Sequence, residues 1–148
     1  MKFEDFTRIN HWQTHLIGHS IDEVERYLGN ATDYGSEKHK KYLALFNDIE
    51  VGFNDDELAF YVQIDLMENQ IPEGTKLFNI KNWPIYGGMS LEECKKILNQ
   101  CGCPYKQNQP ELNPGIIEIH TKSNVVFSFI RIGEMFMGKG LVNVRTNV

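Results

Sequence analysis

Three histidines near the start of the chain are the first residues whose spacing could do chemistry. His11, His15 and His19 recur at every fourth position. On a continuous helix they would share one face, and the first two could hold a metal such as Zn²⁺. The segment lacks the glutamate that a zinc-protease helix carries directly after its first histidine. Gly18 and a predicted helix cap at Ser20 also interrupt a helix before His19. We therefore favour surface or packing histidines, with a metal-dependent enzyme as an alternative.

The three cysteines form no recognisable metal or redox motif. The spacing of Cys94, Cys101 and Cys103 matches neither a zinc ribbon nor a two-residue redox spacer. Cys94 occupies a core-facing position of a predicted helix, so we expect a small buried hydrophobe, whereas Cys101 and Cys103 are expected to be exposed. An odd number of cysteines argues against a secreted disulfide framework and favours a reduced, cytoplasmic compartment.

Other catalytic signatures are missing or incomplete. There is no Gly-x-Ser-x-Gly elbow, and no cysteine lies in a protease-like context. The Gly-Lys-Gly at 138–140 is too short for a phosphate-binding loop and is predicted as a turn. The adjacent pair Asp55 and Asp56 lies in a polar turn, where solvation explains it better than acid–base catalysis. The sequence therefore predicts no catalytic site, no metal and no cofactor.

Two helices that would position any site begin with the same pattern. Ser20 is followed three residues later by Glu23, and Ser90 by Glu93, which is the capping-box spacing. The pattern predicts helices over 21–28 and from 91 to between 99 and 102. Apolar residues recur at helical spacing in both: Ile21, Val24, Tyr27 and Leu28, then Leu91, Cys94, Ile97 and Leu98.

About thirty residues after each cap, the chain alternates with period two. A strand over 45–53, a polar turn over 54–57 and a return strand over 58–66 predict a β-hairpin with one buried face. The expected inward residues of the return strand are Leu58, Phe60, Val62, Ile64 and Leu66, and the outward ones are Ala59, Tyr61, Gln63 and Asp65. The later half repeats this pattern at 117–120 and 125–129, with a further strand at 141–145.

Connecting segments are predicted from their turn residues. Residues 36–44 are expected to form a short helix or the approach to a strand, and 104–115, with three prolines, a loop. The seam between the halves is placed at 68–88. The expected fold is α+β, with two related helix-plus-antiparallel-hairpin units, about 1–74 and 75–148, packed into a single domain over 1–148.

Composition and charge exclude some partners. No apolar run approaches the roughly 20 residues that cross a bilayer, and acids occupy the start where a secretory signal would be basic. A net charge of −5 argues against nucleic acid or an anionic membrane as the main ligand. The charge is uneven: residues 1–74 carry 15 acids against 6 Lys/Arg, or −9, and residues 75–148 carry 5 against 9, or +4. This division points to an interaction surface.

The outward side of the first hairpin is the predicted partner surface. A tyrosine supplies contact area and carboxylates steer a basic partner, although a merely solvated sheet face is the alternative. The candidate residues are Asp48, Glu50, Asp55, Asp56, Glu57, Tyr61, Gln63 and Asp65. In the second half, Glu118, His120 and Ser128 are expected on the same side.

The repeated opening resembles a known structural repeat. Gly18 and the run from Ser20 to Gly29, matched by Gly88 to Leu98 with Pro104 beyond, are similar to the turn-helix opening of the β-lactamase-inhibitor-protein fold and the β-barrel-assembly lipoprotein fold. That resemblance covers about a quarter of the chain. It implies tandem repeats of helices packed on an antiparallel sheet, and an enzyme-inhibitor or envelope-assembly scaffold.

A second resemblance concerns the general type of protein and has no diagnostic motif. Small, acidic, α+β chains of this kind resemble bacterial immunity proteins, the inhibitors of polymorphic or contact-dependent toxins; the segments that carry the likeness are 49–53 with Leu58, and 88–93. It implies a non-enzymatic protein whose acidic half binds a basic toxin domain, such as a nuclease, and occludes its active site. The oligomeric state stays open.

Overall fold

The structure is a computed structural model that describes residues 2–67, 69, 80, 82–112, 115–130 and 140–147. The helices are α1 (Phe3–Ile9), α2 (His11–His15), α3 (Ile21–Leu28) and α4 (Leu91–Gln100). The first four strands are β1 (Asp33–Glu37), β2 (Lys40–Phe46), β3 (Ile49–Phe53) and β4 (Ala59–Asp65). The last four are β5 (Tyr105–Asn108), β6 (Ile116–Thr121), β7 (Val126–Ile130) and β8 (Gly140–Asn147).

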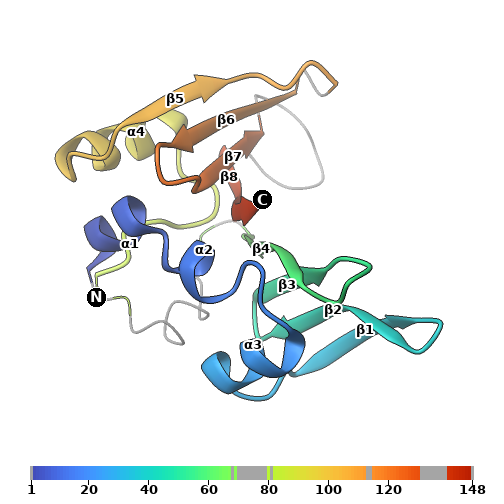
Figure 1. The fold of residues 1–148 in the computed structure, drawn as a ribbon. Coiled ribbons are helices and arrows are strands. Elements are labelled where there is room, and N and C mark those ends of the chain that lie inside the picture. Colours follow the sequence, from blue (N-terminus) through green and yellow to red (C-terminus); the bar gives the residue numbers. More distant parts are fainter. Residues whose placement is uncertain are drawn as a thin grey trace.

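All eight strands belong to one antiparallel sheet. Their order is β1-β2-β3-β4-β8-β7-β6-β5, so the two halves of the chain meet where β4 pairs with β8 (Figure 1). We name α3 with β1–β4 unit 1, and α4 with β5–β8 unit 2. Each unit is a helix followed by a four-stranded meander. The predicted α+β class with two related units is confirmed.

The two units have equivalent backbone hydrogen bonds at the start of their helices. The N–H of Gly18 donates to the carbonyl of Ala59, and that of Gly88 to the carbonyl of Leu141, each at 2.8 Å. Both glycines have positive φ, +83° and +85°, which a residue with a side chain rarely adopts. Each glycine therefore lies in the turn that precedes the helix of its unit and is hydrogen-bonded to the start of the last strand of that unit.

The two units meet at the β4–β8 pair, which we name the seam, and the seam has a pseudo-twofold axis. Since Ala59 and Leu141 are equivalent, Gln63 corresponds to Arg145, and these two residues lie opposite each other in the β4–β8 pair. Asp65 lies opposite Asn143, the equivalent of Tyr61. An antiparallel pair of like strands is self-complementary, as in an isologous dimer. The sheet therefore continues from unit 1 into unit 2 without a break.

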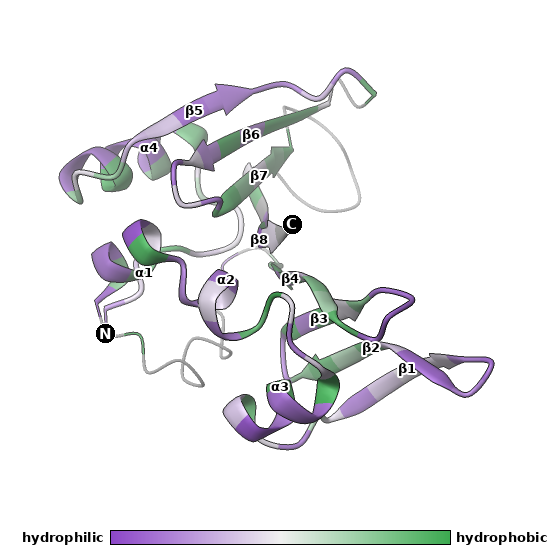
Figure 2. Ribbon diagram, in the orientation of Figure 1, coloured by the Kyte–Doolittle hydropathy of each residue, from purple (hydrophilic) through white to green (hydrophobic). Residues whose placement is uncertain are grey.

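One face of the sheet packs against the helices. Buried residues of α3, Val24 and Leu28, share a hydrophobic cluster with alternate residues of β2, β3 and β4, and Cys94 and Leu98 of α4 join the same cluster. The strand members are Ala44, Phe46, Ile49, Val51, Phe53, Ala59, Val62, Ile64, Ile119, Phe127, Phe129, Leu141 and Val144. Figure 2 shows hydrophobic colour along β2, β3 and β7 and both hydrophilic and hydrophobic colours on α3 and α4. The opposite side of the sheet is the outer face.

The N-terminal helices complete the core and attach to unit 2. Phe6 of α1 and Trp12 of α2 are fully buried, with ring centroids 5.0 Å apart. Between the helices, Asn10 donates from Nδ2 to the carbonyl of Ser123 at 2.8 Å and to Thr146 Oγ1 at 2.9 Å. A buried amide with both contacts satisfied holds α2 against the end of β8.

Some predicted elements are corrected. Residues 36–44 are neither helix nor approach but parts of β1 and β2, and the predicted loop 104–115 contains β5. The predicted strand 45–53 is divided by a turn at Asn47 and Asp48, so each unit has four strands where we expected a hairpin. Pro and turn residues in these segments concealed short strands that are held by pairing with their neighbours. The chain segment 68–88, which we expected to divide the two halves, lies largely outside the described residues.

Candidate functional site

Four of the predicted partner residues lie together on the outer face of unit 1. Glu50 of β3 pairs with Gln63 of β4, and Gly52 pairs with Tyr61. The hydroxyl of Tyr61 donates to Glu50 Oε1 at 2.5 Å. Gln63 Nε2 donates to Asp65 at 3.5 Å. These side chains form a polar row of two hydrogen-bonded pairs, Tyr61 with Glu50 and Gln63 with Asp65, beside the seam.

A β-bulge brings an aromatic residue to this row that the sequence prediction missed. The β3–β4 register shifts so that Phe53 faces Ala59, which leaves Phe60 as the extra residue. Ala59 is consequently buried, at 2% exposure, and Phe60 is 39% exposed, so the predicted inward and outward positions of these two residues were wrong. Leu58 was also expected inside and is exposed. The Phe60 ring meets Tyr61 edge to face, with centroids 4.9 Å apart.

Tyr61 lies flat over the sheet because its neighbour has no side chain. A Cβ on Gly52 would overlap the Tyr61 ring. Burial raises the pKa of the Tyr61 hydroxyl, and its hydrogen bond to Glu50 and the charges of Glu50 and Asp65 raise it further. The phenol therefore stays protonated and remains a donor to the carboxylate.

The remaining predicted carboxylates lie away from that row. Asp48 was expected on the outward face of a strand, but it belongs to the β2–β3 turn. Asp55, Asp56 and Glu57 lie at the opposite end of β3, in the exposed β3–β4 turn. Asn54 Oδ1 shapes that turn by accepting from the N–H groups of Asp56 (3.0 Å) and Leu58 (3.1 Å). No ion pair among the described residues involves the three turn carboxylates.

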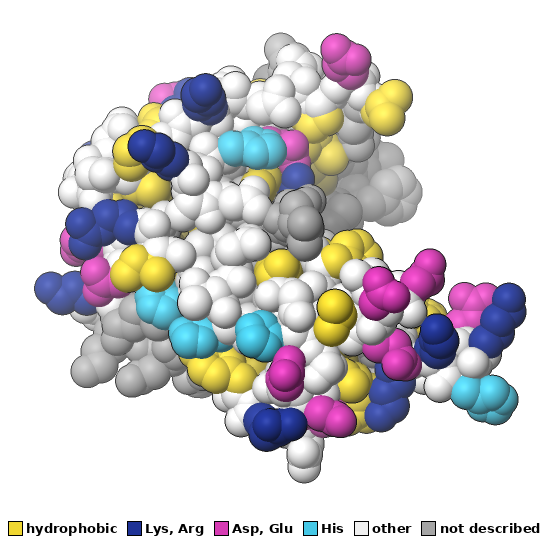
Figure 3. All heavy atoms as spheres, in the orientation of Figure 1, with side chains coloured by type: hydrophobic (Ala, Val, Ile, Leu, Met, Phe, Trp, Pro, Cys, Tyr) yellow, Lys and Arg dark blue, Asp and Glu magenta, His cyan; other side chains and the backbone are white. Residues whose placement is uncertain are grey.

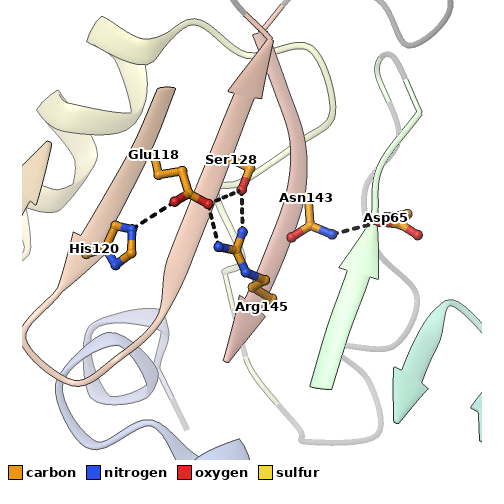
Figure 4. A network of polar contacts seen from close by, with 6 residues as sticks. All are labelled: Asp65, Glu118, His120, Ser128, Asn143 and Arg145. Atoms are coloured by element: carbon orange, nitrogen blue, oxygen red, sulfur yellow. Dashed lines mark hydrogen bonds and ion pairs between the residues drawn. The ribbon is translucent and has the colours of Figure 1, made fainter. Parts of the chain in front are cut away.

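Unit 2 carries a different, internally paired cluster on its outer face (Figure 4). Arg145 of β8 forms an ion pair with Glu118 Oε2 of β6 and donates to Ser128 Oγ of β7 at 2.5 Å. His120 Nε2 lies 3.1 Å from Glu118 Oε1. Across the seam, Asn143 Nδ2 donates to Asp65 at 2.7 Å. This bond joins the outer faces of the two units.

The buried Glu118 carboxylate is stabilised by Arg145 and His120 beside it. Only 8% of Glu118 is exposed. Burial alone would raise its pKa, but the hydrogen bonds and charges of Arg145 and His120 outweigh it and hold the Glu118 pKa below its usual value. Sequence reasoning placed Glu118, His120 and Ser128 on this side. It missed Arg145 and Asn143, for which the alternation of β8 was an available signal.

The N-terminal histidines form a stack on the surface. The His11 and His15 rings stack with centroids 6.0 Å apart, and His15 stacks on Tyr27 at 4.6 Å. His19 Nδ1 lies 3.0 Å from Glu23, beyond the end of α2. Figure 3 shows histidines gathered on one face of the molecule. In the described part of the chain, no three His, Cys, Asp or Glu residues are arranged to hold a metal ion.

The thiols offer little chemistry. Cys94 is fully buried, as predicted, and burial raises its pKa to about 12. Cys103 was expected to be exposed but is 4% exposed, and its Sγ lies 3.7 Å from the Thr7 carbonyl oxygen. Burial also raises the Cys101 pKa. Thiolates, the reactive form, are therefore disfavoured at all three. Of the Gly-Lys-Gly segment, 138 and 139 lie outside the described residues.

Comparison with known proteins identifies no relative: no family model, no curated protein and no solved structure matches the chain. Within the described ranges, no helix is both long and apolar enough to cross a membrane.

Proposed function

We propose that this chain is a non-enzymatic protein-binding module that binds a basic partner through the outer face of unit 1. The observation that carries the proposal is the juxtaposition of Phe60 and Tyr61 with Glu50 and Asp65 on a sheet face opposite the helices. Aromatic residues provide contact area that is buried on binding, and carboxylates around them favour cationic partners. Over the β3–β4 hairpin, hydrophobic and acidic side chains lie side by side (Figure 3).

The charge distribution supports a basic partner. From Gly18 to Leu66, unit 1 carries 11 acids and 4 Lys/Arg, a net charge of −7. The turn carboxylates Asp55, Asp56 and Glu57 extend the negative field beyond the aromatic pair. Such a field accelerates the encounter with a positive protein and makes association sensitive to salt.

The specific role we propose is that of a bacterial immunity protein that binds a cognate basic toxin domain, such as a nuclease, and occludes its active site in the cytoplasm. An eight-stranded sheet presents a broad, preformed surface, which suits inhibition by coverage. The same architecture also suits an envelope-assembly or enzyme-inhibitor scaffold, and we retain that as the second candidate. The stack of His11 and His15 on Tyr27 makes a metal-dependent enzyme the least supported alternative.

The test is binding of a basic toxin domain encoded beside the gene for this chain, measured by calorimetry and by inhibition of the toxin. We expect the triple reversal Asp55→Lys, Asp56→Lys and Glu57→Lys to slow association about tenfold or more at low salt, with a smaller effect at high salt. The matched control reverses three exposed acids elsewhere: Asp22, Glu92 and Glu111.

The two triple variants have the same net charge, so a difference between them locates the interface. Equal affinity of both variants and the natural chain would contradict the proposed surface. Absence of toxin inhibition with tight binding would favour the scaffold candidate, and zinc in the purified protein would favour the enzyme.

A further inference from the structure

We propose that the outer face of unit 1 contains an arginine-binding site in which the Tyr61 ring is the floor, Phe60 the wall and the Glu50 carboxylate the anion. The ligand is an arginine side chain of the protein partner. This inference rests on the proposed function and specifies the chemistry of the contact.

The floor is a flat aromatic ring supported by the sheet. Because Gly52 has no Cβ, Tyr61 lies against the backbone of β3, and its hydroxyl is fixed by Glu50 at 2.5 Å. Tyr61 is partly exposed, so the ring face away from Gly52 can receive a ligand. A ring held in place loses little freedom when a planar cation stacks on it.

The wall and the anion complete the site. Phe60 stands edge to face against Tyr61 at 4.9 Å and is exposed because of the bulge. Glu50 accepts from Tyr61 through Oε1, and its other oxygen has no hydrogen bond among the described residues. Within the same described part, no Lys or Arg pairs with Glu50 or Asp65. The site therefore has negative charge and no cation of its own.

Unit 2 holds a guanidinium on its own outer face. The residue equivalent to Gly52 is Ser128, since both lie at the β-bulge opposite the equivalent residues Tyr61 and Asn143. Ser128 is in contact with the guanidinium of Arg145, which also pairs with Glu118. Unit 1 has Gln63 at the position of Arg145 and Leu43 at the position of Glu118, and its carboxylate Glu50 lies one strand nearer the seam, at the position of Val126. The arginine that we propose for unit 1 therefore comes from a partner and pairs with a carboxylate on β3.

Arginine fits the site better than lysine. A guanidinium is planar, stacks on aromatic rings and donates two parallel hydrogen bonds to a carboxylate, whereas an ammonium is a strongly hydrated point charge. Arginine and lysine carry the same charge, so the net negative charge of unit 1 attracts both at long range. The distinguishing property is therefore the ratio of affinities for arginine and lysine at equal charge.

The experiment titrates the folded chain with hexa-arginine and hexa-lysine peptides and follows the amide resonances of Gly52, Phe60 and Tyr61. We expect hexa-arginine to bind roughly two- to fivefold more tightly, the difference that one exposed cation–π contact provides. Tyr61→Leu should bring the ratio to about one, and Tyr61→Phe, which keeps the ring, should preserve the preference. Glu92→Gln on α4 is the control and should leave the ratio unchanged.

Equal affinities for the two peptides, or a preference that survives Tyr61→Leu, would overturn the arginine site even if the toxin domain binds. If the arginine preference is present and depends on Tyr61 but no basic toxin domain binds, the site stands and the proposed function fails. Should Tyr61→Leu prove unfolded, Gly52→Ala provides the same test, because the added Cβ tilts the ring off the sheet.

Discussion

Units 1 and 2 have the same order of helix and strands, but the polar side chains on their outer faces are arranged differently. Both begin with a glycine turn and a serine-capped helix, and both have a bulge near the start of the last strand. At the seam-facing strands, unit 1 places Gln63 where unit 2 places Arg145. Unit 2 neutralises its buried carboxylate with Arg145, whereas the unit 1 carboxylates Glu50 and Asp65 accept hydrogen bonds from uncharged side chains.

This difference shows where a duplicated scaffold can change. Helix-facing positions such as Val62 and Val144 remain apolar in both units because they fill one shared core. Outer-face positions differ between the units, from the exposed Phe60 of unit 1 to the buried Glu118 and Ser128 of unit 2. Under our proposal, unit 1 provides the binding surface and unit 2 supports it. Four predictions test this contrast.

The largest effect is expected at Arg145. Arg145→Met leaves Glu118 buried without its charge partner, so we expect a loss of about 3–5 kcal/mol in the free energy of unfolding. Gln63→Met, at the equivalent position of unit 1, should cost less than about 0.5 kcal/mol. Urea denaturation measures both. The double variant with Glu118→Met should recover most of the loss, because no buried charge remains. Equal costs at Arg145 and Gln63 would remove the contrast between the units.

A smaller effect is expected at Gly52. The added Cβ of Gly52→Ala meets the Tyr61 ring and should cost about 1–3 kcal/mol through overpacking. In a Tyr61→Ala background the same substitution should be nearly neutral. Ser128→Ala, at the equivalent position, should instead cost about 1 kcal/mol by removing hydroxyl contacts with Arg145 and Glu118. A cost at Gly52 that does not depend on Tyr61 would contradict the flat-ring geometry.

The helix caps should be nearly equal between units. Ser20 Oγ accepts from the Glu23 N–H at 3.3 Å, and Ser90 Oγ from the Glu93 N–H at 3.1 Å. Ser20→Ala and Ser90→Ala should each cost about 1 kcal/mol. Thermal unfolding of the two variants in parallel provides the measurement. A loss at one cap only would show that the two helices do not contribute alike.

The smallest expected effect is the dependence of the free energy of unfolding on acidic pH, which we attribute to Glu118 of unit 2. Glu118 has a lower pKa in the folded chain than its usual 4.5, so its contribution to stability is fully present above pH 4.5. As the pH falls through the folded pKa, Glu118 becomes protonated in both states and the contribution is lost. Denaturation curves at several acidic pH values should show a shallower dependence for Glu118→Gln. Arg145→Met should weaken the same dependence, because Arg145 is a main cause of the shift.

Local patterns were sufficient for the elements that depend on neighbours in the chain. The Ser20 and Ser90 caps, the helices that follow them and the α+β class were predicted because capping and helical periodicity act within a few residues. The burial of Cys94 followed from the same periodicity. The strands β1 and β5 were missed, since they are short, polar edge strands stabilised by pairing with distant segments.

What the sequence by itself determined is the repeated unit, its caps and the sign of its charge, because these are properties of residues close together in the chain. The tertiary structure alone decided which side chains meet. One extra residue in β4 moved Phe60 to the outer face and Ala59 into the core, and the β4–β8 register placed Arg145 opposite Gln63. Bulges and long-range register arise from strand pairing and from the filling of a common core, which period-two patterns do not encode.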